Sequence, residues 1–130
     1  MSMRADSELM VITKSKDLIK YIFTISENAP KKFRFTLISK MQNTALDVME
    51  SLILANEIML GKEHNNLERK NLQHKAIAQL KVLDAVAMVS LEQQCLLPKQ
   101  YEMISRLISD CIKLTGAWIN SDNKRLNNIK

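Results

Sequence analysis

The sequence predicts an all-helical protein, an antiparallel up-down-up-down four-helix bundle. Glycine and proline occur only twice each among 130 residues, so the chain lacks the turn residues that a β protein needs. Apolar residues recur at helical spacing in four long stretches separated by short polar connections. This length suits one domain over residues 1–130, with a core of its own.

The first helix is predicted from about Ser7 to Ser26. Ser7 is a suitable capping residue, and Pro30 ends the helix because the residue before a proline avoids the α conformation. Residues 1–6 are expected to form a flexible tail. The predicted apolar face comprises Leu9, Ile12, Ile19, Ile22 and Phe23.

The second helix is predicted from about Lys32 to Leu60, with Gly61 as its C-terminal stop. The polar stretch 62–66 is expected to be a loop. Both this helix and the next have broad apolar faces, which favour burial on several sides and therefore self-association.

The third helix is predicted from about Leu67 to Gln94. Asp84 is the only polar residue between Val82 and Val89, and its expected partner is Lys81, one turn earlier. A structural ion pair or an oligomer contact explains Asp84 better than catalysis does.

The fourth helix is predicted from Pro98 to about Asn120, since proline suits the first turn of a helix. The polar, basic stretch 121–130 is expected to be a second flexible tail. Cys95 and Cys111 lie in apolar stretches and are interpreted as buried, reduced thiols.

Catalytic and metal-binding motifs are absent from the sequence. It contains no HExxH, GxSxG, CxxC or glycine-rich phosphate loop. We therefore expect no enzyme activity, no cofactor and no metal. The chain also lacks a signal-peptide pattern and an apolar run near the ~18 residues of a membrane span, so a cytoplasmic protein without membrane contact is expected.

Charge gives the main indication of a partner. Nineteen Lys and Arg oppose fourteen Asp and Glu, which gives a net charge of +5. This charge favours RNA or DNA as a partner, although a merely soluble basic surface explains it equally well.

A cluster of cations lies at the start of the second helix and predicts a phosphate-binding patch: Lys31, Lys32 and Arg34. The alternative is a solvated loop. Lys124 and Arg125 would add nonspecific phosphate contacts. No base stacking is predicted beside these groups.

Four segments carry a family resemblance, and it covers nearly the whole chain. They are Pro30-Lys31-Lys32-Phe33-Arg34-Phe35-Thr36-Leu37, Leu54-Ala55-Asn56-Glu57, Pro98-Lys99-Gln100-Tyr101-Glu102 and Leu114-Thr115-Gly116-Ala117-Trp118-Ile119. Together they resemble the bacterial four-helix bundle proteins related to the accessory variability determinant of diversity-generating retroelements. A wider group of relatives is encoded in intervening sequences of bacterial 23S ribosomal RNA.

The resemblance implies a small basic bundle that forms a pentameric barrel, binds nucleic acid and a retroelement reverse transcriptase, and has no catalysis of its own. Lys81 and Lys113 match basic positions of that family. The chain departs from it at Asp84-Ala85, where a second arginine is common, and at Ile112, where a glycine is expected. An Asn-x-Ala-Glu-Gly segment typical of the intervening-sequence proteins is missing, which favours the first group.

Two functions are therefore compared. The first is a nucleic-acid-binding accessory factor that helps a reverse transcriptase use its template RNA. The second is a structural or scaffolding oligomer of the intervening-sequence type, in which the basic residues only maintain solubility.

Overall fold

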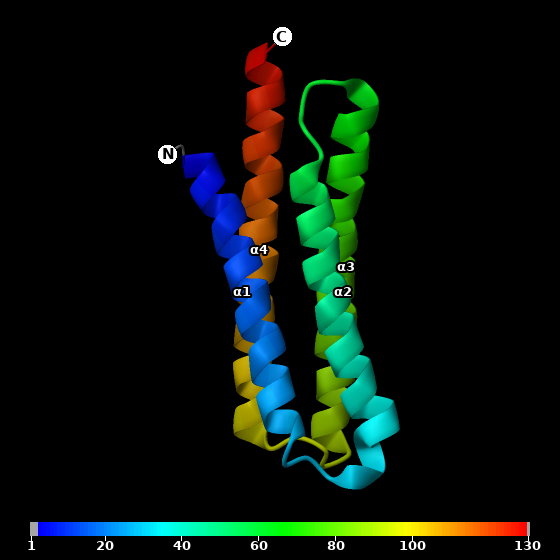
Figure 1. The fold of residues 1–130 in the computed structure, drawn as a ribbon. Helices are drawn as coiled ribbons and strands as arrows, with labels where there is room; N and C mark the ends of the chain where they lie inside the picture. Colours follow the sequence, from blue (N-terminus) through cyan, green and yellow to red (C-terminus); the bar gives the residue numbers. More distant parts are fainter. Residues whose placement is uncertain (1–2, 130) are drawn as a thin grey trace.

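The structure, a computed structural model, describes residues 3–129 and contains four long helices and no strand within that range (Figure 1). The predicted all-helical class is therefore confirmed. The elements in chain order are α1 (Met3–Ser26), the short segments η1 (Lys31–Phe33) and η2 (Arg34–Ile38), α2 (Ser39–Glu57), α3 (Glu63–Glu92) and α4 (Pro98–Ile129).

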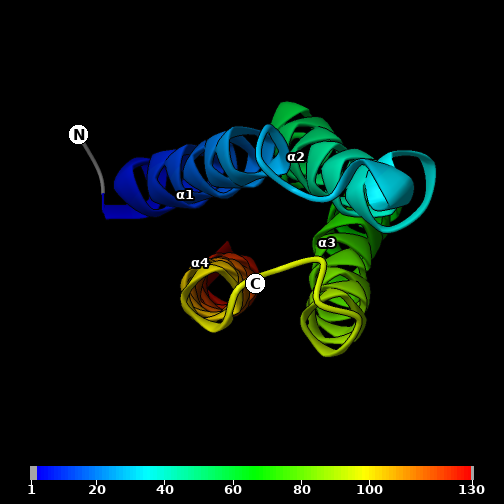
Figure 2. The same cartoon turned by 90° about the horizontal axis from the view of Figure 1, so that it is seen from below.

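The four helices run alongside one another and enclose a single apolar core. Each helix contacts the next one along the chain, and α1 also contacts α4 (Figure 2). The α1–α2 and α3–α4 connections lie at the lower end of the molecule in Figure 1, and the α2–α3 connection lies at the upper end. The largest fully buried apolar side chains come from all four helices and include Leu18, Ile22, Met41, Leu52, Leu80, Leu83, Ile104 and Trp118.

The buried face of α1 differs from the predicted one. Ile22 is buried as predicted, but Phe23 is 41% exposed, and the side chain of Leu9 lies outside the described side chains. The buried positions follow a regular spacing of three and four residues: Val11, Ser15, Leu18, Ile22 and Ile25. A serine occupies one of these positions, and its hydroxyl donates to the Ile12 carbonyl at 2.7 Å. This polar residue within the buried stripe concealed the pattern in the sequence.

The second predicted helix is not one continuous α-helix. It begins as a 3₁₀ turn, widens into a five-residue π-helix and becomes α-helical only at Ser39. It ends at Glu57 rather than Leu60, and Gly61 lies in the following connection with φ +140°. The Gly61 amide donates to the Asn66 Oδ1 atom at 2.9 Å, which ties the connection to the first turn of α3.

Exchanging the two glycines for alanine should change stability in opposite directions. Gly61→Ala should lower the free energy of unfolding by about 1–3 kcal/mol, because its φ is one that L-residues rarely adopt. Gly116→Ala should raise it by about 0.4–1 kcal/mol, because Gly116 is helical and an added Cβ would meet no atom within 4 Å. Urea denaturation of both variants measures this difference. Equal effects would contradict the conformational argument.

Helix α3 begins earlier than predicted, at Glu63, so most of the predicted 62–66 loop is helical. Its end at Glu92 lies close to the predicted Gln94. The predicted pairing of Asp84 with Lys81 is wrong: Asp84 accepts a hydrogen bond from the Tyr101 hydroxyl at 3.3 Å, whereas Lys81 is exposed and makes no ion pair with it among the described residues. Asp84 thus connects α3 to α4. Sequence spacing does not indicate Tyr101 as its partner, because the two residues lie on different helices.

Helix α4 extends through most of the predicted C-terminal tail. It does not end near Asn120 but continues to Ile129, and Asp122 is only 3% exposed. Helix α1 likewise begins at Met3 rather than Ser7, so residues 3–6 of the predicted N-terminal tail are helical. Residues 1, 2 and 130 of the two predicted tails lie outside the described residues. The extension of α4 matters for the fold because Asp122 is the centre of a buried polar network.

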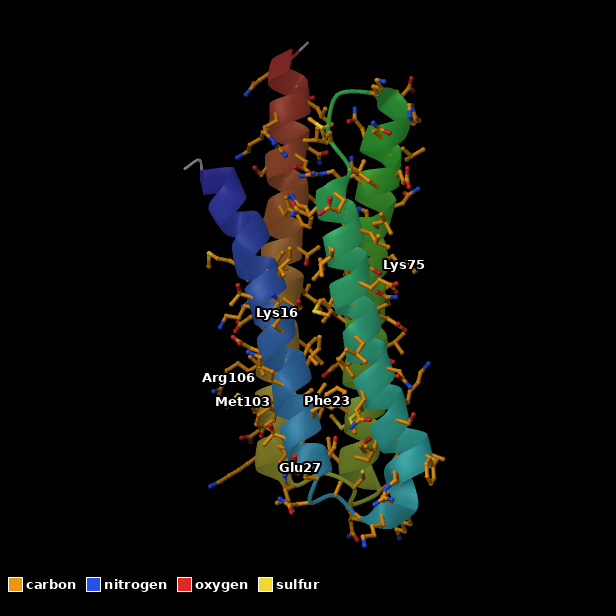
Figure 3. The ribbon with its side chains drawn as sticks, viewed as in Figure 1. Lys16, Phe23, Glu27, Lys75, Met103 and Arg106 are labelled. Atoms are coloured by element: carbon orange, nitrogen blue, oxygen red, sulfur yellow. The ribbon has the colours of Figure 1, made fainter. Side chains whose placement is uncertain are left out.

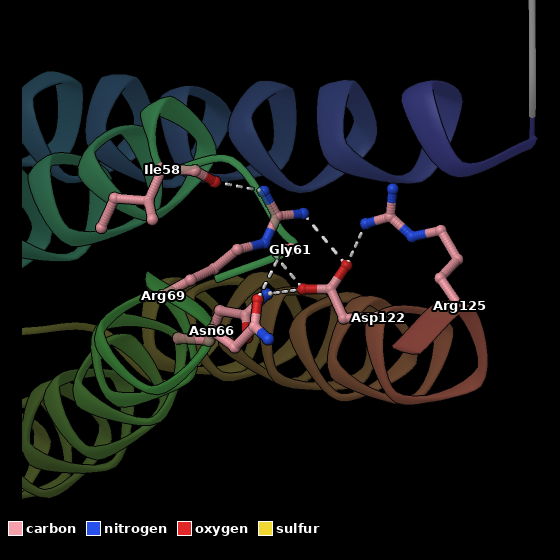
Figure 4. A network of polar contacts seen from close by, with 7 residues as sticks. Ile58, Gly61, Asn66, Arg69, Asp122 and Arg125 are labelled. Atoms are coloured by element: carbon pink, nitrogen blue, oxygen red, sulfur yellow. Dashed lines mark hydrogen bonds and ion pairs between the residues drawn. The ribbon is translucent and has the colours of Figure 1, made fainter. Parts of the chain in front are cut away.

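This network joins α3, α4 and the residue that follows α2 (Figure 4). Arg69 on α3 donates from Nε and Nη2 to the two Asp122 oxygens at 2.8 and 3.0 Å, and from Nη1 to the Ile58 carbonyl at 2.9 Å. Gln73 donates to the same carboxylate at 3.0 Å, and Arg125 also pairs with it. Burial raises the pKa of Asp122, but these hydrogen bonds outweigh it, so the net pKa lies below the usual value.

The two cysteines are free and buried, as predicted. Burial raises the pKa of the Cys111 thiol to about 12, and the neighbouring Asp110 carboxylate acts in the same direction. Since the thiolate is the reactive form of cysteine, both the burial and the raised pKa disfavour reaction of Cys111 at neutral pH.

Candidate nucleic-acid interface

Three exposed cations, Lys31, Lys32 and Arg34, lie on the connection between α1 and α2. We call them the basic corner. Pro30 is extended (φ −57°, ψ 130°), and its carbonyl accepts the Phe33 amide at 3.1 Å, which closes the 3₁₀ turn. The π-helix follows without a break. The basic corner is therefore part of a hydrogen-bonded structure.

Apolar neighbours fix the direction in which these cations point. Phe33 and Leu37 are half-buried and pack against the core, and Ile38 is buried. Because these three residues face inward, the basic side chains between and before them remain in solvent. The Lys32 ammonium also lies 5.1 Å from the centroid of the Phe33 ring, a cation–π distance.

A pocket of about 240 Å³ lies at this corner. Lys31 and Arg34 line it, and Glu27 from the end of α1 is its one acidic residue. Figure 3 shows Glu27 at the lower end of α1, beside the connection. The remaining lining residues are Ser26, Asn28, Ala29, Pro30 and Ile38. Two cations and one carboxylate leave the pocket with a net positive lining, which suits an anion.

The predicted basic residues on α3 and α4 lie elsewhere. Lys81 is exposed on α3. Lys113 is exposed on α4 and lines a shallow pocket of about 330 Å³ with Lys14 and Asp110. The Lys14 ammonium and the Asp110 carboxylate approach to 3.9 Å across the α1–α4 contact. Lys113 therefore belongs to a pocket in which a carboxylate is already paired with another lysine.

The two C-terminal candidates lie at the opposite end of the bundle from the basic corner. Lys124 is exposed about 40 Å farther along α4 than Pro98, at a rise of about 1.5 Å per residue. Arg125 pairs with the buried Asp122 and so contributes to the polar network. Of the seven predicted binding residues, the three of the basic corner lie together. The other four, which are on α3 and α4, do not join them.

Sequence interpretation overlooked an aromatic residue within this segment. Phe33 and Phe35 alternate with the basic residues, and the Phe35 side chain is 86% exposed. Phe35 therefore offers an aromatic face near these cations, which the sequence interpretation did not take into account. The alternation Lys-Phe-Arg-Phe was visible in the sequence, but the outward direction of Phe35 was not.

Two further features are absent from the described part of the chain. Within residues 3–129, no cluster of three histidine, cysteine or acidic side chains is placed to hold a metal ion. No helix in that range is long and apolar enough to cross a membrane.

The family model described as bAvd-like matches residues 9–122. The chain belongs to the bAvd-like family. This confirms the resemblance to the accessory variability determinant and covers the basic corner, Lys81, Lys113 and the Arg69–Asp122 pair. The bAvd-like family is one of accessory proteins and is not a catalytic family. Comparison with curated proteins finds no match.

Proposed function

We propose that this bAvd-like chain is a non-enzymatic, cytoplasmic nucleic-acid-binding protein that helps a retroelement reverse transcriptase use its template RNA. Membership of an accessory family supports the general role. The observation that carries the nucleic-acid function is the basic corner, where inward-packed neighbours hold three exposed cations in place and two of these cations, Lys31 and Arg34, line a pocket. Lys81, Lys113, Lys124 and Arg125 would add weaker, separate phosphate contacts.

We further propose that the chain is an up-down-up-down bundle that assembles into a ring-like homo-oligomer. Large apolar side chains remain 37% to 61% exposed on α2 and α3, the two helices with excess apolar faces: Leu46, Ile53, Leu54, Leu67, Val82, Met88 and Val89. Contact with a second copy would bury these side chains. The number five follows from the resemblance to the pentameric accessory determinants.

Replacing Lys31, Lys32 and Arg34 together with glutamine should weaken binding to structured RNA by about 10- to 100-fold at 0.1 M salt. Each lost phosphate contact also removes counterion release, so the slope of log affinity against log salt should become shallower by about 2 to 3. Fluorescence anisotropy across a salt series measures both quantities. The variant should stay folded, because exposed charges usually change stability by less than about 0.5 kcal/mol.

A matched control removes the same charge elsewhere. Lys16, Lys20 and Lys75 are exposed on α1 and α3, and Figure 3 places Lys16 and Lys75 away from the basic corner. Replacing these three with glutamine should change RNA affinity much less than the corner variant. Equal losses would mean that only net charge matters, and an unchanged affinity in the corner variant would remove the basic corner from the proposal.

The scaffolding alternative is tested with the same samples. It predicts no binding of the wild-type protein to RNA or DNA at low salt, together with a defined oligomer. Light scattering should give an oligomer at tens of micromolar under either function. A monomer at that concentration would contradict the proposed assembly.

A further inference from the structure

Phe35 is the most exposed of the large apolar side chains described. It is 86% exposed, whereas Phe33, two residues earlier, is half-buried against the core. Single exposed apolar residues are common, so exposure alone carries no function. What distinguishes Phe35 is its setting, directly after Arg34 and close in sequence to Lys31 and Lys32.

The backbone holds this ring in place. Phe35 lies in the π-helix Arg34–Ile38, a rare conformation that is frequent at functional sites. Inward-packed residues anchor the segment before and after it, Phe33 on one side and Leu37 and Ile38 on the other. An aromatic side chain on an anchored backbone loses little conformational freedom when a ligand stacks on it.

The surrounding charges indicate the kind of ligand. The three cations of the basic corner lie in the same connection as Phe35, and two of them, Lys31 and Arg34, line the pocket of about 240 Å³. A nucleotide combines a flat aromatic base with a phosphate, so one ligand can use both features. Proteins that bind single strands combine a basic surface with stacking aromatic side chains in this way.

We infer that the basic corner binds an unpaired nucleotide of a single-stranded nucleic acid, with its base stacked on Phe35 and its phosphate beside Lys31 and Arg34. This inference rests on the proposed nucleic-acid function and makes it more specific. In a duplex, the base faces are already stacked on one another and are inaccessible to Phe35. The corner therefore prefers single strands.

Phe35→Ala tests the stacking directly. Its affinity for a labelled single-stranded oligoadenylate at low salt should fall about 5- to 100-fold, the range for one stacked base. Binding to an RNA duplex of the same length should change by less than about 2-fold, because only phosphates are contacted there. The salt slope should stay as in the wild type, since no charge is removed. Phe35→Tyr should retain the affinity because the ring remains.

A matched control and a direct optical signal accompany this test. Met59 is 79% exposed in the connection at the opposite end of the bundle, so Met59→Ala should leave oligoadenylate binding unchanged. Phe35→Trp places an indole at the site, and oligoadenylate should quench its fluorescence. The native Trp118 is fully buried and supplies a constant background.

The outcomes separate this inference from the function on which it rests. If the corner glutamine variant loses affinity while Phe35→Ala does not, the stacking is overturned and phosphate binding remains. Equal losses of Phe35→Ala on single strand and duplex also overturn it. A smaller oligomer in light scattering with unchanged oligoadenylate affinity assigns Phe35 to a contact with a second copy instead. Failure of the wild type to bind either RNA overturns the inference together with the proposed function.

Discussion

Replacing Asp122 with alanine should lower the free energy of unfolding by about 3–5 kcal/mol, a loss typical of breaking a buried ion pair. Asp122 is 3% exposed and Arg69 is 5% exposed, so removal of the carboxylate leaves a guanidinium in the interior without its counter-charge. Urea denaturation followed by circular dichroism measures this loss. Asp47, an exposed residue of α2, supplies the control, and Asp47→Ala should change stability by less than about 0.5 kcal/mol.

A double variant shows whether the buried charge causes the loss. Arg69→Met combined with Asp122→Leu removes both charges and keeps apolar volume at both positions. Because an apolar replacement of a buried ion pair is often neutral, the double variant should recover most of the stability that Asp122→Ala loses. A double variant less stable than the single one would mean that the hydrogen bonds to Ile58 and Gln73 matter more than the ion pair.

The same network predicts an acid limit to stability. The pKa of Asp122 is lower in the folded protein than its usual value of about 3.9, so its contribution is present above that pH. It is lost as the pH falls through the folded pKa, because the folded protein must then take up a proton. The wild-type free energy of unfolding should therefore decrease below about pH 4. The Asp122→Asn variant should lack the part of this pH dependence that Asp122 contributes.

Trp118→Ala should lower the free energy of unfolding by about 3–5 kcal/mol, because it deletes the largest fully buried side chain of the core. The ring also lies 5.0 Å beneath the Arg69 guanidinium, so its loss removes a cation–π contact within the network. Circular dichroism is the appropriate probe, since the variant has no tryptophan.

Trp118→Phe refines this prediction. The Trp118 indole Nε1 is buried and has no hydrogen-bond partner among the described residues. Phenylalanine keeps an aromatic ring below Arg69 and removes this unsatisfied donor, which offsets part of the lost packing. Its cost should thus be less than half that of Trp118→Ala. Equal costs would indicate that the indole nitrogen is satisfied in solution, for example by a buried water.

The sequence predicted the central part of each helix better than its two ends. The central parts were recognised because apolar residues recur every three or four positions, as in Leu80, Leu83 and Ala87. The end of α4 was placed too early because residues after Asn120 are polar, and polar residues suggest a solvated tail. Asp122 can be buried because partners distant in the chain stabilise its charge, above all Arg69, 53 residues earlier.

In the candidate site, too, the sequence predicted one part and only the structure showed the other. The cluster Lys31, Lys32 and Arg34 was recognised from adjacent residues of one charge, a local signal. The outward direction of Phe35 depends on how many residues the backbone takes per turn, and the local π-helix changes that number. A helical projection of the sequence assumes a uniform α-helix, so it could not decide which of Phe33 and Phe35 faces the core.

By itself, the sequence determined the helical class, the approximate extent of four helices, the family resemblance and the position of the basic corner. Each of these depends on residues that are close together in the chain, through periodicity, turn residues or runs of charge. Only the tertiary structure decided that Asp122 is buried and paired with Arg69, and that the half-buried Asp84 accepts a hydrogen bond from Tyr101. Those pairings join residues of different helices, and the free energy of burying a charge depends on the partner that packing supplies.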